Sequence, residues 1–133
     1  MNRISSLFAM LAALALFTVS APASATDEHH ATGEKTVTKS ITGEVVDMGC
    51  YLGHGAKGEK HISCAAKCLA QGMPMGLLTT NGTLYLVTLD HDNADPYNNL
   101  KDMAGKNATV TGEMLNRNGV KAIAASKVQL ASK

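Results

Sequence analysis

The feature that most limits the fold of this chain is a pair of Asn-Gly steps, each between two β-rich runs. Asn81-Gly82 separates residues 76–80 from residues 83–90, both rich in apolar and β-branched side chains. Such a step favours a tight type I′ hairpin, because Asn and Gly tolerate positive φ. The second step lies in Asn116-Arg117-Asn118-Gly119 and turns a strand at 108–115 into a last strand at 120–130. We expect the last strand to be kinked near Ala125-Ser126.

The first strand is expected at residues 36–48, where β-branched residues alternate with polar ones. Gly43 in its middle indicates a bulge or a sharp bend. The glycine-rich residues 49–60 predict a loop. Residues 61–71 have the pattern of a short helix, which Gly72 would end. A loop and a helix therefore separate the first strand from the first hairpin.

A second helix is expected between the two hairpins, with Asp95 as its N-cap, Pro96 in its first position and an end near Ala104, before Gly105. Five strands with a helix between the third and the fourth predict a mainly β fold, a five-stranded OB-fold-like Greek-key barrel. A short helical Cys-rich insertion would follow its first strand. Alternation along the strands places six apolar residues inside the barrel: Val45, Leu77, Leu84, Leu86, Val110 and Ile123.

Two short motifs carry a resemblance to a known family: residues 41–47 (ITGEVVD) and residues 104–113 (AGKNATVTGE). On these motifs the chain resembles the small exported bacterial OB-fold (BOF-like) domains over about residues 37–130. The resemblance implies the barrel and does not imply a function, because one fold hosts many functions. The Cys/His insertion, residues 49–75, is not part of the generic barrel and is the place to look for function.

The N-terminal residues have the pattern of a secretory signal peptide. Arg3 is followed by an apolar run at residues 7–19 and by the small residues Ala23-Ser24-Ala25, which suit a signal peptidase. The run is shorter than the roughly 18 to 20 residues of a bilayer span. We expect a periplasmic or secreted protein with no stable membrane anchor after cleavage. The predicted division is a signal peptide at 1–25, a flexible polar lead-in at 26–35 and a single OB-like domain at 36–133.

Charge and aromatic content argue against a nucleic-acid partner. Without Arg3, the chain has 11 basic and 11 acidic residues. A neutral chain offers no attractive field to a polyanion. The aromatic residues after the signal peptide are Tyr51, Tyr85 and Tyr97, too few for a base-stacking platform. We therefore expect no binding of nucleic acid.

The three cysteines, Cys50, Cys64 and Cys68, fall within nineteen residues, with His54 and His61 among them. At 100° per residue, a helix over 61–71 places His61, Cys64 and Cys68 on one narrow stripe. Cys50 leaves the first strand where the loop can bring it against that stripe. Three thiolates and one imidazole suit Zn²⁺, and three sulfurs also suit Cu(I). His61 is favoured as the fourth ligand because the helix directs it, and His54 is the alternative because its flanking glycines let it reach inward.

Other uses of the cysteines stay open. A disulfide from Cys50 to Cys64 or Cys68 would suit an oxidising compartment and a small core, although it leaves one thiol over. That thiol could serve a redox protein, and buried cysteines could also be plain core residues. Met73-Pro74-Met75 offers thioethers to Cu(I) or fills gaps in the core.

The sequence lacks the common signatures of enzymes. It contains no nucleophile elbow, no H-E-x-x-H pair, no P-loop and no Cys-x-x-Cys pair. We therefore predict a small exported protein that binds Zn or Cu(I) and is not an enzyme. The alternatives are a metal-free binding module stapled by a disulfide and a thiol redox protein.

Overall fold

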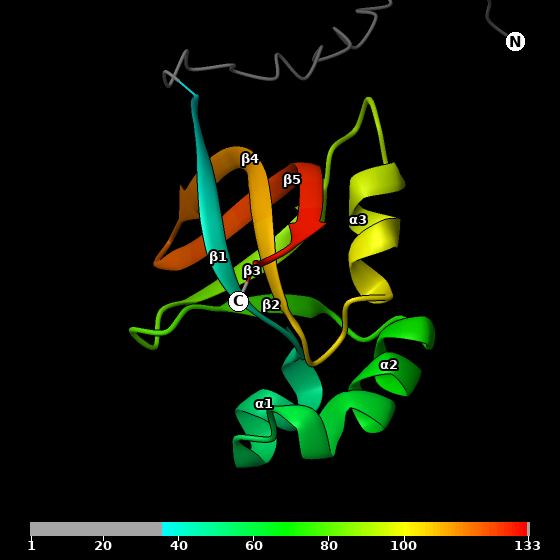
Figure 1. Ribbon diagram of the computed structural model, residues 1–133. Helices are drawn as coiled ribbons and strands as arrows, with labels where there is room; N and C mark the ends of the chain where they lie inside the picture. The colour runs from blue at the N-terminus through cyan, green and yellow to red at the C-terminus, as the bar shows by residue number, and fades with distance from the viewer. Residues whose placement is uncertain (1–35, 133) are drawn as a thin grey trace, which may run out of the picture. The chain divides into compact units, whose positions relative to one another are not determined.

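The computed structural model describes residues 36–132, so the predicted signal peptide and lead-in lie outside the described residues. Five strands form a closed barrel, and helices lie outside it (Figure 1). The predicted mainly β class, the helical insertion after the first strand and the helix before the fourth strand are confirmed. The elements in chain order are β1 (Val37–Asp47), α1 (Met48–His54), the 3-10 turn η1 (Glu59–His61), α2 (Ile62–Ala70), β2 (Met75–Leu78), β3 (Leu84–Leu89), α3 (Asp95–Lys101), β4 (Asn107–Arg117) and β5 (Val120–Leu130).

The strand order around the barrel is β1-β2-β3-β5-β4, and pairing of β4 with β1 closes it. Only the β3–β5 pair is parallel among these strands. This arrangement is compatible with an OB-like fold. The first strand serves two neighbours, because Glu44 is aligned with Asn107 of β4 and with Leu78 of β2. A Cβ at Gly43 would lie 2.6 Å from the Leu78 carbonyl oxygen, so the absence of a side chain lets the backbones approach where β1 changes partner.

The two Asn-Gly steps form different turns. Asn118 and Gly119 both have positive φ, 51° and 85°, and the flanking residues of β4 and β5 are paired, as in a type I′ hairpin. At the first step only Gly82 has positive φ, and its N–H donates to the Thr79 carbonyl at 2.9 Å. The β2–β3 connection is therefore a longer loop closed by Thr79, and the type I′ prediction for Asn81-Gly82 was wrong.

The kink predicted in the last strand is a β-bulge. The β4–β5 register shifts between Thr111 and Gly112, which pair with Lys127 and Ala125 and leave Ser126 without a partner. The Ser126 hydroxyl donates to the Thr111 carbonyl at 3.1 Å. A bulge at this point lets a long strand bend around the barrel.

The barrel interior contains most of the predicted core. Val45, Leu77, Val110 and Ile123 are fully buried, whereas Leu84 and Leu86 are only half-buried. The prediction was therefore wrong about which alternate residues of β3 face inward. Val87 is buried and Tyr85 packs against the core cluster, so these residues, and not Leu84 and Leu86, point into the barrel. Both phases of the run are apolar, and the pairing of β3 with its neighbours selects one.

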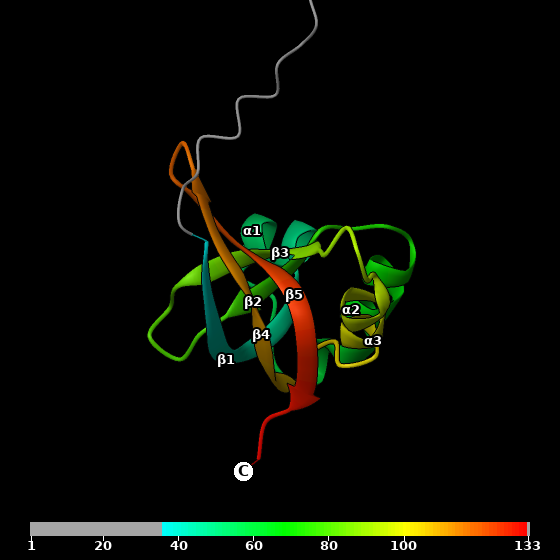
Figure 2. The same ribbon diagram turned by 90° about the horizontal axis from the view of Figure 1, so that it is seen from above.

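The second predicted helix is shorter than expected. It spans Asp95–Lys101, and Asp95 is its first residue and not its N-cap. The Asn93 side chain instead accepts the Asp95 N–H at 3.0 Å. After the helix the chain turns at Gly105, which has a φ of 70° and packs against Ile62 at the start of α2. In Figure 2, α2 and α3 lie side by side next to the barrel.

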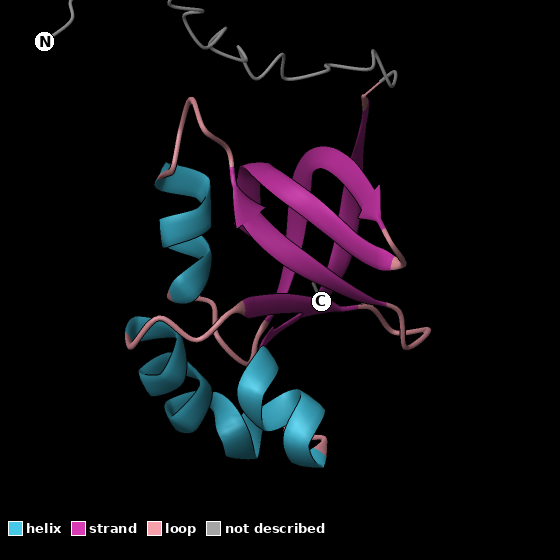
Figure 3. Ribbon diagram, turned by 180° about the vertical axis from the view of Figure 1, so that it is seen from behind, coloured by secondary structure: helices cyan, strands magenta, loops and turns pink. Residues whose placement is uncertain are grey.

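The largest correction is helix α1, which occupies part of the predicted loop at 49–60. Asp47 caps its N-terminus by accepting the Cys50 N–H at 2.8 Å, and Gly55, with a φ of 69°, closes its C-terminus. Capping at both ends offsets the weak helix propensity of its two interior glycines. Figures 1 and 3 show α1 and α2 together at the end of the barrel where β1 leaves it.

Candidate metal centre

Three thiols meet where α1 faces α2. The Sγ atoms of Cys50, Cys64 and Cys68 all lie within 4.8 Å of one another, and all three cysteines are free. The buried residues Ala65 and Leu69 anchor α2 to the barrel. Each follows a cysteine by one position, so burying them fixes how the Cys64–Cys68 stripe is rotated. Cys50 comes from the middle of α1 and completes the group.

The spacing of the thiols fits a bound ion. Three atoms no more than 4.8 Å apart share a point that is at most about 2.8 Å from each, against a Zn–S bond of about 2.3 Å. Each Sγ would therefore need to move inward by at most about 0.5 Å, which a change in side-chain torsion can supply. Cys64 is exposed, so this corner of the protein is open to solvent.

Asp47 is a site residue that the sequence analysis missed. Its side chain has no exposed area, and both carboxylate oxygens have partners: Oδ1 accepts the Cys50 N–H, and Oδ2 lies 2.9 Å from His61 Nε2. Burial raises the pKa of Asp47, but the hydrogen bonds from Cys50 and His61 and the His61 charge together hold that pKa below its usual value. An aspartate directly before the helix was the available signal, and it is informative only once α1 is recognised as a helix.

The two candidate histidines have different places. His61 groups with Asp47 and Cys50 within 4.8 Å, but it does not join the group of three thiols at that separation. His54 is exposed in the last turn of α1 and belongs to neither group among residues 36–132. The structure thus brings together the three predicted cysteines and places His61 beside one of them, tied to Asp47.

The carboxylate also affects the thiols. A hydrogen bond to Asp47, burial and the Asp47 charge raise the pKa of Cys50 to about 12. Burial and the neighbouring Cys64 raise the pKa of Cys68. Without metal, these two thiols hold their protons at neutral pH. This is opposite to the lowered pKa of a reactive redox cysteine, so neither Cys50 nor Cys68 has the character that the redox alternative requires.

The insertion is tied to the barrel on both sides of the site. Glu44 of β1 accepts the Gly58 N–H, and the Met48 N–H donates to the Pro74 carbonyl at 2.9 Å. Met73 donates its N–H to the Cys68 carbonyl at 3.0 Å. A Cβ added at Gly49, the residue before Cys50, would lie only 2.7 Å from the Met73 Sδ, so this thioether packs directly against Gly49. Met73 therefore packs against the start of α1, whereas Met75 is buried in the barrel core.

No family model, curated protein or solved structure matches the chain. Its function is therefore inferred from the residues and the geometry of the site.

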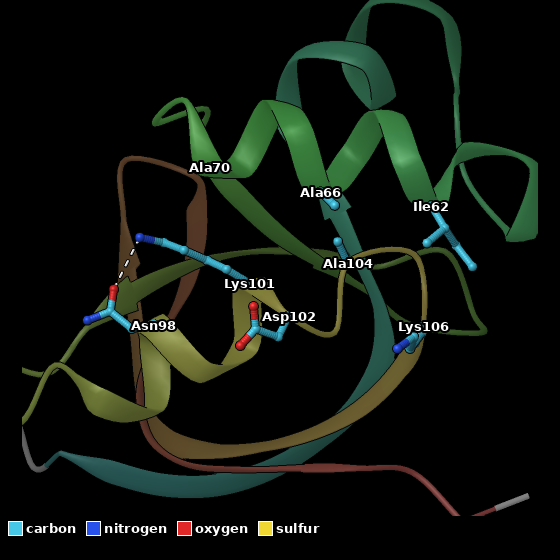
Figure 4. A pocket seen from close by; sticks show the side chains of 8 residues that line it. All are labelled: Ile62, Ala66, Ala70, Asn98, Lys101, Asp102, Ala104 and Lys106. Atoms are coloured by element: carbon cyan, nitrogen blue, oxygen red, sulfur yellow. Dashed lines mark hydrogen bonds between the residues drawn. The ribbon is translucent and has the colours of Figure 1, made fainter.

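A separate hollow of about 360 Å³ lies between α2 and α3 (Figure 4). Apolar side chains form its α2 wall, and mostly polar side chains of α3 and of the following turn form the other. Lys101 Nζ donates to Asn98 Oδ1 at 3.1 Å across its edge. At 100° per residue, Ala66 is about opposite Cys64 and Cys68 on α2, so the hollow is not part of the thiol site. Its lining residues are Ile62, Ala66, Ala70, Asn98, Lys101, Asp102, Ala104 and Lys106.

Within residues 36–132, no helix is long and apolar enough to cross a membrane.

Proposed function

We propose that this chain is a small exported metal-binding protein that holds one ion, Zn or Cu(I), through Cys50, Cys64 and Cys68. The observation that carries the proposal is the convergence of three Sγ atoms within 4.8 Å from two separate helices. Cysteine thiolates are the preferred protein ligands of both ions. Export is supported by the signal-peptide pattern of residues 1–25. The barrel's strand order also supports membership of the small exported OB-fold domains.

A metal accounts for the site better than a disulfide does. A disulfide would use two of the three thiols and leave the third within 4.8 Å of the bond, where it could exchange with it. An ion uses all three donors at once. The spread of the donors over α1 and α2 also means that an ion would link the two helices of the insertion, so its binding would add to the stability of the fold.

The proposal is tested by replacing Cys68 by serine, with His54→Ala as the matched control on the exposed end of α1. We expect wild type and His54→Ala to bind one equivalent of metal and Cys68→Ser to lose binding by roughly 100-fold or more. Metal analysis and a free-thiol count on the same sample measure this. A strong chelator should lower the melting temperature of wild type and leave that of Cys68→Ser unchanged.

A disulfide would give a different result in the same melting experiments. If the chelator leaves the melting temperature of wild type unchanged and a reductant lowers it, the cysteines form a disulfide and the metal proposal is wrong. Export is tested separately by N-terminal sequencing of the secreted protein, which should begin at Thr26. Secreted protein that still began at Met1 would contradict the cleavage.

A further inference from the structure

We infer that the ion is Cu(I), held by the three thiolates alone, with no nitrogen ligand. This inference rests on the proposed function and adds to it the identity and the coordination of the ion. Three features of the site carry it: the donors that converge, the partner that holds the nearby histidine, and the thioether of Met73, which lies against the residue before Cys50.

The donors that converge are all sulfur. Within the described part of the chain, neither His61 nor Asp47 joins the group of three Sγ atoms within 4.8 Å. Structural Zn²⁺ takes four protein ligands, so three thiolates leave its coordination incomplete. Thiolates are soft ligands that select Cu(I), and a set of three can surround a monovalent ion in a plane. The group of three thiols is therefore complete for Cu(I) and one ligand short for structural Zn²⁺.

His61 is held away from the role of fourth ligand. Its Nε2 is 2.9 Å from Asp47 Oδ2, and Asp47 is fully buried. His61 would have to move to reach all three thiols, and that shift would have to keep the Nε2 hydrogen bond to Asp47 or leave a buried carboxylate without this partner, which is unfavourable. The same carboxylate fixes the start of α1 through the Cys50 N–H. Asp47 and His61 thus position Cys50 and are not ligands in this arrangement.

The surroundings of the thiols add soft and apolar character. The Met73 thioether packs over Gly49, the residue before Cys50, and the Met73 backbone N–H is bonded to the Cys68 carbonyl, so Met73 contacts the backbone at or beside two of the three cysteines. Thioethers favour Cu(I) and bind Zn²⁺ poorly. Cys64 is the exposed member of the group, which gives an ion a path in and out by exchange at that sulfur.

The test uses the full protein after signal cleavage, reduced and handled without oxygen. Cu(I) is titrated in competition with a chromogenic Cu(I) chelator, and Zn²⁺ and Co²⁺ are titrated separately. The variants are Cys64→Ser, chosen because Cys64 is exposed, and His61→Ala and Met73→Leu. Circular dichroism checks that each variant is folded.

We expect one Cu(I) per chain with sulfur as its only neighbour in X-ray absorption. Cys64→Ser should lose roughly 100-fold or more in Cu(I) affinity, whereas His61→Ala should lose at most about tenfold, as for a residue behind the ligands. Met73→Leu should lose less than Cys64→Ser.

Two other outcomes are distinguishable. A tetrahedral Co²⁺ spectrum with a nitrogen ligand that disappears in His61→Ala, together with tight Zn²⁺ binding, would overturn the Cu(I) inference and keep the proposed metal site. Failure of the fully reduced protein to bind any of the three ions would overturn the proposed function itself.

Discussion

Replacing Asp47 by alanine removes two hydrogen-bond acceptors from a fully buried position at the start of α1. Loss of an N-cap costs about 1 kcal/mol, and loss of a charged hydrogen bond, here to His61, costs about 1.5 kcal/mol or more. We therefore expect Asp47→Ala to lower the free energy of unfolding by about 2 to 3 kcal/mol at pH 7. Asp47→Asn keeps an oxygen for the Cys50 N–H, and asparagine caps as well as aspartate, so it should lose roughly half as much.

The cost should depend on pH in a defined direction. The folded protein holds the pKa of Asp47 below its usual value of 3.8, so the ionised carboxylate stabilises the fold. That contribution is fully present above the unfolded pKa and disappears as pH falls through the lower, folded pKa. The difference in stability between wild type and Asp47→Asn should thus shrink as the pH falls below about 4.

Urea unfolding of metal-free wild type, Asp47→Ala and Asp47→Asn at pH 7 and at pH 3 measures both effects. The metal is removed first by a chelator, because bound metal would add its own stabilisation. Equal losses in the two variants would show that Asp47 does not act as the cap of α1. A difference between wild type and Asp47→Asn that persists unchanged at pH 3 would show that Asp47 does not act as a charged partner of His61.

Two further predictions concern the barrel and the thiols. Gly112→Ala should destabilise the fold strongly, by about 3 kcal/mol or more in thermal or urea unfolding, because the new Cβ would collide with the Ala124 carbonyl oxygen of β5. Gly119→Ala, with positive φ and open space around it, should cost only about 1 kcal/mol, and equal losses in the two variants would contradict this. In metal-free protein at pH 8, iodoacetamide should modify the exposed Cys64 well before Cys50, because a pKa of about 12 leaves roughly one Cys50 in ten thousand as the thiolate. Peptide mass mapping gives the order of modification, and Asp47→Ala should speed the reaction of Cys50. Faster modification of Cys50 than of Cys64 in wild type would refute the assigned role of the carboxylate.

The sequence by itself determined the order of the five strands and of helices α2 and α3, and it indicated that the three cysteines come together. Local signals are enough for this, because β-branched runs and Asn-Gly steps depend on neighbouring residues only. The helical stripe of Cys64 and Cys68 likewise follows from 100° per residue, and Ser126 was predicted as a kink within its strand. Each of these inferences needs no knowledge of what packs against the element.

Tertiary structure decided what depends on contacts between distant segments. In β3 both faces are apolar, and only pairing with β2 and β5 turned Val87 inward and Leu86 outward. Residues 48–54 carry two glycines and no strong helix signal, yet capping by Asp47 makes them helical. Helix periodicity puts His61 on one stripe with Cys64 and Cys68, but His61 Nε2 is hydrogen-bonded to the carboxylate of Asp47 at the end of β1. Helix periodicity places a side chain on a face; the segment opposite that face decides which partner it meets.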